Sequence, residues 1–342
     1  MNIVITNQCN DQCLHCYVDA GPSKREVELK LSQWGPVLKE IRAFGDNQIH
    51  LFGGEPFLVP FIREFCEMLS TMGFNFNIAT NGTLIIPDDI PWIIETDVSL
   101  LISVFGSQSF HNEFTSNPQG YSTVVDNVTR LIENGVHVSI ATCLMRDNMG
   151  QFNELVEFFA HLGVNYFIVL HFSPIGRGRN LKDQLIPSKD WYNFFHDLRK
   201  ELPHIQQRVQ HDVRVSFELA TCPVKNFSEF FSLGALGPCA LPWDHNLTID
   251  WTGRVYPCVL FLNDPRWVMG SVLETPLKDM VRELTEDWLQ ARAKPADCSS
   301  SLCRYYRLCK GGCFAYHLES GKDYRCDDQK FIPFCPLRIV SL

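Results

Sequence analysis

Residues 2–17 read Asn2-Ile3-Val4-Ile5-Thr6-Asn7-Gln8-Cys9-Asn10-Asp11-Gln12-Cys13-Leu14-His15-Cys16-Tyr17, and the fold is best understood outward from this stretch. Its first five residues are mostly apolar or β-branched, which predicts a short strand. Three cysteines follow, separated by three and then by two residues. We therefore expect a loop at the carboxyl end of the first strand that carries three thiols.

The remaining cysteines are also bunched. The chain has 342 residues and 14 cysteines, eight of which lie between Cys239 and Cys335, while Cys66, Cys143 and Cys222 stand apart. Disulfides are rare in a reducing cytosol, so clustered cysteines in a chain without an export signal indicate metal or redox chemistry. The N-terminus lacks the basic and apolar regions of a signal peptide, and a cytoplasmic location is expected.

Composition excludes two classes of partner. No run of 18 apolar residues occurs, so no membrane-spanning segment is expected. The formal net charge of −9 disfavours nucleic acid, because binding to nucleic acid relies on basic side chains that neutralise phosphates.

From residue 2 to residue 171, β-rich runs alternate with amphipathic helical patterns. The expected strands are Asn2–Thr6, Gln48–Phe52, Phe74–Thr80, Asp97–Phe105, Val136–Thr142 and Tyr166–His171. The expected helices are Leu31–Phe44, Pro60–Met72, Tyr121–Asn134 and Gln151–Leu162, with a shorter segment at Asp88–Glu95. Gly45, Gly73, Gly135 and Gly163 close helices as C-caps. Repeated βα units predict an α/β fold, a partial (βα)6 TIM-like barrel with its chemistry at the carboxyl ends of the strands.

The texture changes after the sixth strand. Prolines and glycines punctuate residues 172–238, where Trp191–Lys200 is the clearest helical run. From residue 239 onward, short strands and cysteine-dense loops predict a small α+β domain. The expected organisation is a barrel over residues 1–203, a bridging region over 204–238 and a cysteine-rich domain over 239–342.

Three closely spaced cysteines suit an iron–sulfur cluster. Thiolates are soft ligands for such clusters or for zinc, and a [4Fe–4S] cluster normally takes four cysteines. Cys9, Cys13 and Cys16 would leave one iron open to another ligand. Zinc would need a fourth protein ligand, for which His15 is the neighbouring candidate.

At this point the sequence resembles the radical S-adenosylmethionine (SAM) superfamily, whose signature is this cysteine spacing followed by an aromatic residue, here Tyr17. The second expected strand ends in Phe52-Gly53-Gly54-Glu55-Pro56, which is similar to the family's Gly-Gly-Glu-Pro motif. The resemblance implies that Cys9, Cys13 and Cys16 hold a [4Fe–4S] cluster, and that SAM binds its open iron. It places Tyr17, Gly53, Gly54, Glu55 and Pro56 at the SAM site. Two glycines permit close backbone approach, and a carboxylate suits the SAM ammonium.

Other strand ends match the family more loosely. Thr80-Asn81-Gly82 ends the third expected strand and Ser103 ends the fourth, where relatives contact SAM. Asn81 and Ser103 are therefore candidate SAM-binding residues, with ordinary turn residues as the alternative. Many relatives read Ser-x-Asp-Gly at the fourth strand, whereas this chain reads Ser103-Val104-Phe105-Gly106 and lacks the acid.

The C-terminal cysteines resemble the SPASM domain, which implies two auxiliary [4Fe–4S] clusters. One cluster would take Cys239, Cys258 and Cys313, with Cys222 as a candidate fourth ligand. The other would take Cys298, Cys303 and Cys309, completed by Cys335 or alternatively Cys326. Residues 247–258 fit the family's cysteine-delivering hairpin, but Cys298 and Cys303 stand two residues further apart than in relatives. A zinc-ribbon fold is the alternative.

The resemblance implies reductive cleavage of SAM and removal of a hydrogen atom from an unactivated C–H bond. It favours a ribosomally made peptide as substrate, to be crosslinked, joined by a thioether or epimerised. A sugar or nucleoside dehydrogenase or decarboxylase is the alternative enzyme, and an electron-transfer scaffold is a third class. Only eight residues precede Cys9, so we expect either a separate leader-peptide-binding protein or a small substrate. We also expect an external one-electron donor of the flavodoxin or ferredoxin type.

Five further residues are assigned hypotheses. Cys143 ends the fifth expected strand and is a candidate hydrogen-atom donor, with a buried core thiol as the alternative. His111 and Asn112 are interpreted as structural. Arg177 and Arg179 are candidates to bind an anionic substrate group or the SAM carboxylate, with a solvated loop as the alternative.

Overall fold

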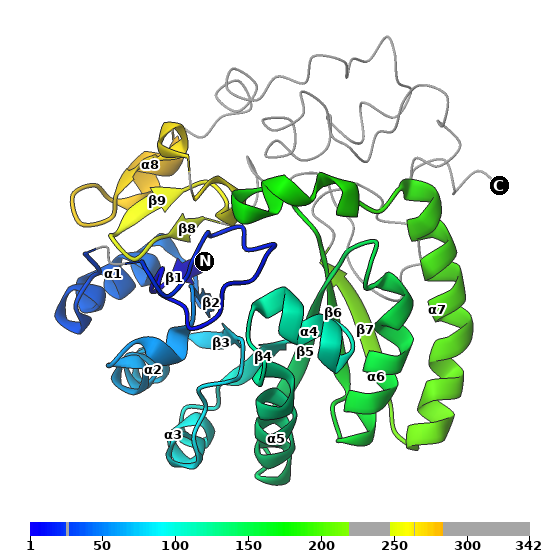
Figure 1. The fold of residues 1–342 in the computed structure, drawn as a ribbon. Helices are drawn as coiled ribbons and strands as arrows, with labels where there is room; N and C mark the ends of the chain where they lie inside the picture. Colours follow the sequence, from blue (N-terminus) through cyan, green and yellow to red (C-terminus); the bar gives the residue numbers. More distant parts are fainter. Residues whose placement is uncertain (25–26, 219–246, 263, 283–342) are drawn as a thin grey trace.

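The computed structural model describes residues 1–24, 27–218, 247–262 and 264–282. Within these ranges the chain forms one ten-stranded sheet of order β10-β9-β8-β1-β2-β3-β4-β5-β6-β7. The sheet curves, and most of the helices lie along its outer side (Figure 1). Within the described residues the sheet ends at β10 on one side and β7 on the other. The sheet is therefore open and forms a partial barrel. The expected α/β class is confirmed.

Seven strands pair parallel to one another in chain order. They are β1 (Asn2–Val4), β2 (Gln48–Phe52), β3 (Asn75–Thr80), β4 (Ser99–Ser103), β5 (Val138–Leu144), β6 (Tyr166–His171) and β7 (Arg214–Glu218). Because the strands are parallel, their carboxyl ends meet at one rim of the sheet.

In the described part of the chain, seven helices connect these strands. They are α1 (Leu31–Phe44), α2 (Ile62–Thr71), α3 (Ile90–Glu95), α4 (Gln108–Thr115), α5 (Gly120–Glu133), α6 (Phe152–His161) and α7 (Ser188–Val209). A further helix, α8 (Leu277–Arg282), follows the last strand of the described residues. The four glycines predicted to close helices all have positive φ, as a left-handed C-cap requires. A membrane-spanning helix, long and apolar enough to cross a bilayer, is not found in the described part of the chain.

Alternation along the strands separates two faces of the sheet. In β4, Leu100 and Ile102 are buried in the main hydrophobic core together with Val124 of α5, whereas Leu101 and Ser103 are only half-buried. Successive side chains of a strand point to opposite faces. The helix-covered face is therefore the apolar core, and the inner face is left available for a site.

The sheet extends further than the six expected strands. Helix α7 runs through Pro203, although a proline costs a helix one hydrogen bond. Strand β7 then pairs with β6 inside the segment that the sequence assigned to a bridging region. The signal for β7 is present in the sequence, because Val213, Val215 and Phe217 are buried and alternate with polar residues. The domain boundaries themselves stay a prediction.

The expected cysteine-delivering hairpin is confirmed. Strands β8 (Thr248–Ile249) and β9 (Arg254–Tyr256) pair antiparallel, and β8 also pairs with β1. The Asp250 carboxylate accepts hydrogen bonds from the backbone N–H groups of Thr252 and Arg254 and so closes the turn. The third strand, β10 (Gly270–Ser271), pairs with β9. The hairpin and β10 therefore join residues 248–271 to the same sheet as β1.

The turn after β2 lies against the loop that follows β1. A β-carbon on Gly54 would lie 2.0 Å from the carbonyl oxygen of Gln8, and one on Gly53 would lie 2.6 Å from that of Thr6. Real contacts of this kind are never so short, and both partners are backbone atoms that cannot rotate away. The two glycines are therefore required by packing.

We predict that Gly54→Ala destabilises the fold by about 3 kcal/mol, because overpacking against backbone typically costs 1–3 kcal/mol and occasionally more. Gly150→Ala is the matched control, since a β-carbon there meets nothing within 4 Å. Thermal unfolding of the purified variants measures both. Equal midpoints for the two variants would contradict the close packing of Gly54 against Gln8.

Candidate functional site

The cysteine loop, defined as residues 7–21, carries three thiols beyond the carboxyl end of β1. Cys9 is buried, Cys13 and Cys16 are half-buried, and none of them forms a disulfide. Burial raises the pKa of Cys9 to about 12 and that of Cys13 well above its ordinary value. The neighbouring cysteines raise both pKa values further. The three sulfurs therefore lie within electrostatic reach of one another, and a nearby positive charge such as iron would favour the thiolate forms of Cys9 and Cys13.

The donor chemistry of the loop fits an iron–sulfur cluster, because thiolates are the usual ligands of [4Fe–4S] clusters and bind different irons. Among the described residues, no group of three His, Cys, Asp or Glu side chains is placed to hold one metal ion. Ligation of a cluster rather than zinc by Cys9, Cys13 and Cys16 stays a prediction.

The turn after β2 is hydrogen-bonded to the cysteine loop. The backbone N–H of Gly54 donates to the carbonyl of Thr6 at 2.7 Å, and that of Glu55 donates to Gln8 at 2.8 Å. The sequence attributed the two glycines to close approach toward a ligand. The structure shows a close approach to the cysteine loop instead, and contact of Gly53, Gly54 and Pro56 with SAM stays a prediction.

Glu55 is fully buried and joins the ends of β2 and β3. Its Oε1 accepts from the Thr80 hydroxyl at 2.7 Å and from the backbone N–H of Phe57 at 3.1 Å, while its Oε2 accepts from the backbone N–H of Asn81 at 2.8 Å. Burial raises the pKa of Glu55 to about 7, although these hydrogen bonds oppose the shift. An ionised carboxylate offers about four acceptor positions. Oε2 therefore keeps one for a further donor.

Asn81 connects β3 to the first cysteine. Its Nδ2 donates to Asn10 Oδ1 at 2.9 Å and lies 3.9 Å from Cys9 Sγ, while its Oδ1 accepts from the backbone N–H of Thr83. The side chain is thereby fixed with its N–H donors toward the loop. The structure thus places this SAM-site candidate beside Cys9, a predicted cluster ligand.

Helix α4, which the sequence analysis did not predict, supports the other side of the loop. The backbone N–H groups of Gln12 and Leu14 donate to Thr115 and Phe114 at 3.0 Å each. The His15 ring stacks on Phe114 with centroids 4.7 Å apart. Phe110 and Phe114, four residues apart, are the apolar signal by which this short helix could have been found.

Three buried polar atoms of the loop have no hydrogen-bond partner in the described part of the chain. They are Asn7 Oδ1, Asp11 Oδ2 and His15 Nδ1. Asp11 is buried and its other oxygen accepts from Asn117 at 2.9 Å. Buried polar atoms are nearly always paired. These unpaired buried polar atoms, which the sequence does not reveal, support a bound group or ordered water at the loop.

Cys143 and Ser103 lie on the inner face near the rim. Ser103 is half-buried at the end of β4, and Tyr17 is half-buried after the third cysteine. Strand β5 continues to Leu144, so Cys143 lies within it and packs in a second apolar cluster with Phe105 and Phe172. Burial raises the pKa of Cys143 to about 12. These residues are near the site, but their roles stay predictions.

His111, Asn112 and Arg177 have structural contacts. Burial lowers the pKa of His111 to about 4, and its Nδ1 accepts from the backbone N–H of Phe105. Asn112 Oδ1 accepts from the backbone N–H of Tyr121. Arg177 donates to the carbonyls of Cys13 and Ala20 in the cysteine loop, so it is a contact of that loop rather than of solvent alone.

Of the predicted auxiliary-cluster ligands, only Cys258 lies among the described residues. Cys258 follows β9 and is half-buried. The remaining candidates lie outside the described residues: Cys222, Cys239, Cys298, Cys303, Cys309, Cys313, Cys326 and Cys335. Their ligation stays a prediction.

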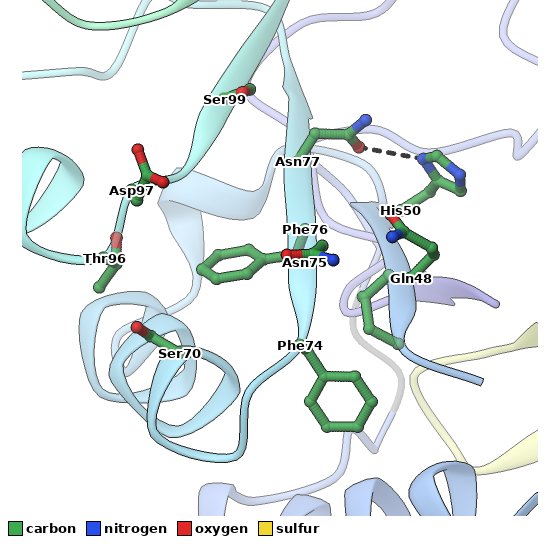
Figure 2. Close-up of a pocket in the computed structure, with 11 residues that line it drawn as sticks. Gln48, His50, Ser70, Phe74, Asn75, Phe76, Asn77, Thr96, Asp97 and Ser99 are labelled. Atoms are coloured by element: carbon green, nitrogen blue, oxygen red, sulfur yellow. Dashed lines mark hydrogen bonds between the residues drawn. The ribbon is translucent and has the colours of Figure 1, made fainter. Parts of the chain in front are cut away.

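A polar pocket of about 470 Å³ lies at the opposite rim of the sheet. Gln48, Asn75 and Ser99, the first residues of β2, β3 and β4, line it, and His50 Nδ1 lies 3.3 Å from Asn77 Oδ1 (Figure 2). In βα barrels chemistry occurs at the carboxyl ends of strands. The pocket is therefore not the candidate site, which is the rim with the cysteine loop.

Two family models match the chain. Residues 3–159 match the radical SAM superfamily, and residues 239–311 match SPASM, an iron–sulfur cluster-binding domain. The AdoMet-dependent heme synthase of Oleidesulfovibrio alaskensis is 26% identical over 326 residues, covering 91% of this chain and 81% of that protein. The mycofactocin maturase MftC of Mycobacterium tuberculosis is 25% identical over 328 residues, covering 93% and 78%.

Solved structures share the fold. Streptococcus suis SuiB bound to S-adenosylmethionine superposes with a TM-score of 0.74 at 16% identity, covering 96% of this chain and 76% of SuiB. SuiB bound to its precursor peptide SuiA has the same TM-score. The thiol spacing, the Gly-Gly-Glu-Pro turn against the cysteine loop, and both domain matches agree. This chain belongs to the radical SAM superfamily and carries a SPASM domain.

Proposed function

We propose that this chain modifies a ribosomally made peptide, using SAM and a [4Fe–4S] cluster held by Cys9, Cys13 and Cys16. The observation that carries the SAM chemistry is the hydrogen-bonded contact between the cysteine loop and the turn bearing Glu55. It sets three soft thiolate ligands beside a buried carboxylate. When bound, SAM takes one electron from the cluster and supplies a radical that removes a hydrogen atom from an unactivated C–H bond.

The residues of the rim supply binding and charge for that chemistry. Oε2 of Glu55 accepts one hydrogen bond, from the backbone N–H of Asn81. It can therefore accept a second hydrogen bond from an ammonium. Asn81 holds its amide toward Cys9, where hydrogen bonds to sulfur influence cluster potential. Asp11 and Glu55, once ionised, favour a cationic cosubstrate.

Support for a peptide substrate comes from the relatives. MftC is named a maturase, and SuiB has been crystallised with a precursor peptide. A heme synthase matches a similar share of the chain, so the substrate needs a direct test. Anaerobically reconstituted protein, SAM and a reduced flavodoxin should release more 5′-deoxyadenosine with a genomically adjacent short peptide, and the peptide mass should change. Stimulation by a sugar or nucleotide alone would overturn the peptide proposal.

We predict that Cys9→Ala/Cys13→Ala/Cys16→Ala abolishes SAM cleavage. Wild-type protein should hold about twelve irons per chain and the triple variant about eight, if the SPASM domain holds two further cubanes. Cys66→Ala is the control, because Cys66 is a buried thiol of α2 without a role in the site. Iron and sulfide analysis and 5′-deoxyadenosine release give the result, and an unchanged iron count in the triple variant would refute the ligand assignment.

We predict that SAM affinity rises between pH 6 and pH 8. The pKa of Glu55 is raised to about 7, so its carboxyl is neutral below this range and negative above it, where it attracts an ammonium. Glu55→Gln should abolish this pH dependence and weaken binding at pH 8 about tenfold or more, since a charged hydrogen bond contributes about 1.5–3 kcal/mol.

Equilibrium binding of SAM to the anaerobic protein across this range measures the effect. The exposed Glu113 of α4 gives a matched control, and Glu113→Gln should behave as wild type. A pH profile for Glu55→Gln that parallels the wild-type profile would exclude Glu55 as its origin.

We predict that Cys143 returns a hydrogen atom to the substrate radical, and that the sulfur radical left on Cys143 is restored to S–H by one electron from the external donor and one proton from solvent. Its raised pKa keeps the sulfur as S–H, the form that donates a hydrogen atom. For the wild type in D2O, product should contain deuterium at the reacted carbon, and Cys143→Ala should lose it while still releasing 5′-deoxyadenosine. Mass spectrometry of the product decides this, and unchanged deuterium content in the variant would end the idea.

A further inference from the structure

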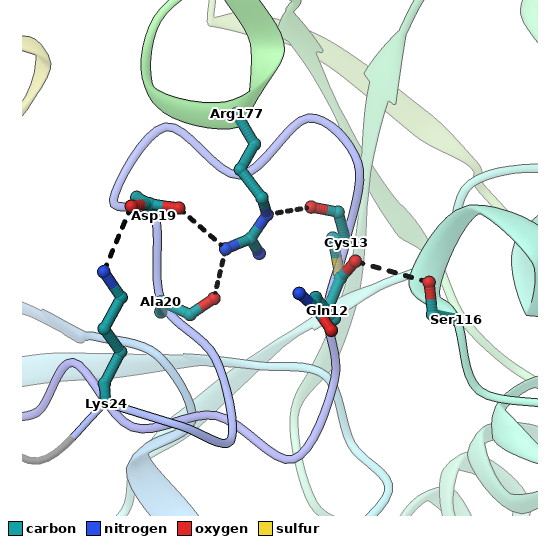
Figure 3. Close-up of polar contacts among 7 residues, drawn as sticks. All are labelled: Gln12, Cys13, Asp19, Ala20, Lys24, Ser116 and Arg177. Carbon is teal, nitrogen blue, oxygen red and sulfur yellow. Dashed lines mark hydrogen bonds and ion pairs between the residues drawn. The ribbon is translucent and has the colours of Figure 1, made fainter.

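Arg177 reaches from the segment after β6 to the cysteine loop (Figure 3). It is the second residue of the 3₁₀ segment η4 (Gly176–Gln184). Its Nε donates to the carbonyl of Cys13 at 2.8 Å, and its Nη1 donates to the carbonyl of Ala20 at 2.6 Å and to Asp19 Oδ1 at 3.0 Å. One guanidinium therefore spans the part of the loop that contains Cys16.

The backbone of Gly176 and Arg177 also packs against the cysteine loop. The backbone N–H of Arg177 donates to the carbonyl of Cys16 at 3.0 Å. Gly176 has a φ of 58°, and a β-carbon on it would lie 2.4 Å from that same carbonyl oxygen. This contact does not involve the Arg177 side chain. Substitution of Arg177 therefore leaves the approach of the two segments in place.

The charge of Arg177 acts on the cluster ligands against the surrounding acids. Asp11 of the same loop and Glu55, whose backbone binds Gln8, are acids, whereas Arg177 places a positive charge beside Cys13, with its Nε 2.8 Å from the Cys13 carbonyl oxygen. Its side chain is 21% exposed, so solvent screens it only in part. Asp19 offsets some of this charge, but the same carboxylate also pairs with Lys24 at 3.1 Å.

We propose that Arg177 is a positioning residue of the N-terminal cluster, whose fork fixes the Cys13 and Ala20 carbonyls and whose charge favours the reduced state. The inference rests on the proposed [4Fe–4S] cluster at Cys9, Cys13 and Cys16. One-electron reduction adds a negative charge to the cluster, and a cation nearby stabilises that charge. Lysine retains the charge but not the planar fork, so charge and geometry are separable by substitution.

The test is a redox titration of the anaerobically reconstituted full chain, followed by electron paramagnetic resonance. The signal that disappears in Cys9→Ala/Cys13→Ala/Cys16→Ala identifies the N-terminal cluster. Arg177→Gln should make its reduction about tenfold less favourable, which is about 59 mV for one electron. Arg177→Lys should keep a potential near that of the wild type. Lys24→Gln, an equal change of charge in the same loop region, should leave the potential unchanged.

Iron content and reduction potential together distinguish the possible results. Loss of about four irons in Arg177→Gln and not in Lys24→Gln would support the anchoring role. Wild-type potential and iron content in Arg177→Gln would overturn the inference, as would an equal shift in Arg177→Lys or in Lys24→Gln. If wild-type protein lacks any signal that depends on Cys9, Cys13 and Cys16, the proposed cluster itself is wrong.

Discussion

The backbone contact between residues 53–55 and residues 6–8 is the constraint on which the rest of the site depends. It exists only because Gly53 and Gly54 have no side chains, since β-carbons there would overlap the carbonyl groups of Thr6 and Gln8. The contact fixes the backbone of Glu55 at Gln8 and leaves its carboxylate to bind Thr80 and Asn81. A single turn thus joins the ends of β1, β2 and β3, which are neighbours in the sheet.

A loop of fifteen residues without regular structure of its own would be costly to order by itself, because each fixed residue loses backbone entropy. The cysteine loop is held instead by segments that follow four other strands. The β2 turn and Asn81 hold its first part, α4 its middle, and Arg177 its last part. Each support belongs to a rigid βα unit. A cluster bound there would therefore keep its position relative to the inner face of the barrel.

The charge at this rim depends on the protonation of its buried thiols and carboxyls. Buried thiols and carboxyls with raised pKa values favour their protonated forms until a cation arrives. Iron bound at the proposed site would supply that cation for the cysteines, and Arg177 adds a positive charge beside Cys13. The acids, once ionised, would favour a positively charged cosubstrate. Binding of the metal and of SAM would then be coupled to loss of protons from the same small region.

Sequence patterns predict contacts that are local and miss those made across the barrel. The bounds of α1, β2 and β6 agree with the periodicity because each element is amphipathic or β-rich along its own length. The cysteine spacing likewise indicates the chemistry of its own loop. Arg177, by contrast, binds carbonyls 157 and 164 residues away in the chain, and carbonyls have no side-chain signature.

The same reasoning explains the two structural surprises of the barrel. Gly53 and Gly54 were attributed to a ligand because glycine in a motif signals close approach, but sequence does not reveal what approaches. Helix α4 is only eight residues long, so it shows little hydrophobic periodicity in the sequence. It contacts the loop through the backbone carbonyls of Phe114 and Thr115, which accept hydrogen bonds from the loop. In this protein the thiols define the chemistry locally, whereas the means of holding them is distributed over most of the sheet. Residues that act through backbone groups, such as Arg177, are therefore where structure adds most to what cysteine patterns predict.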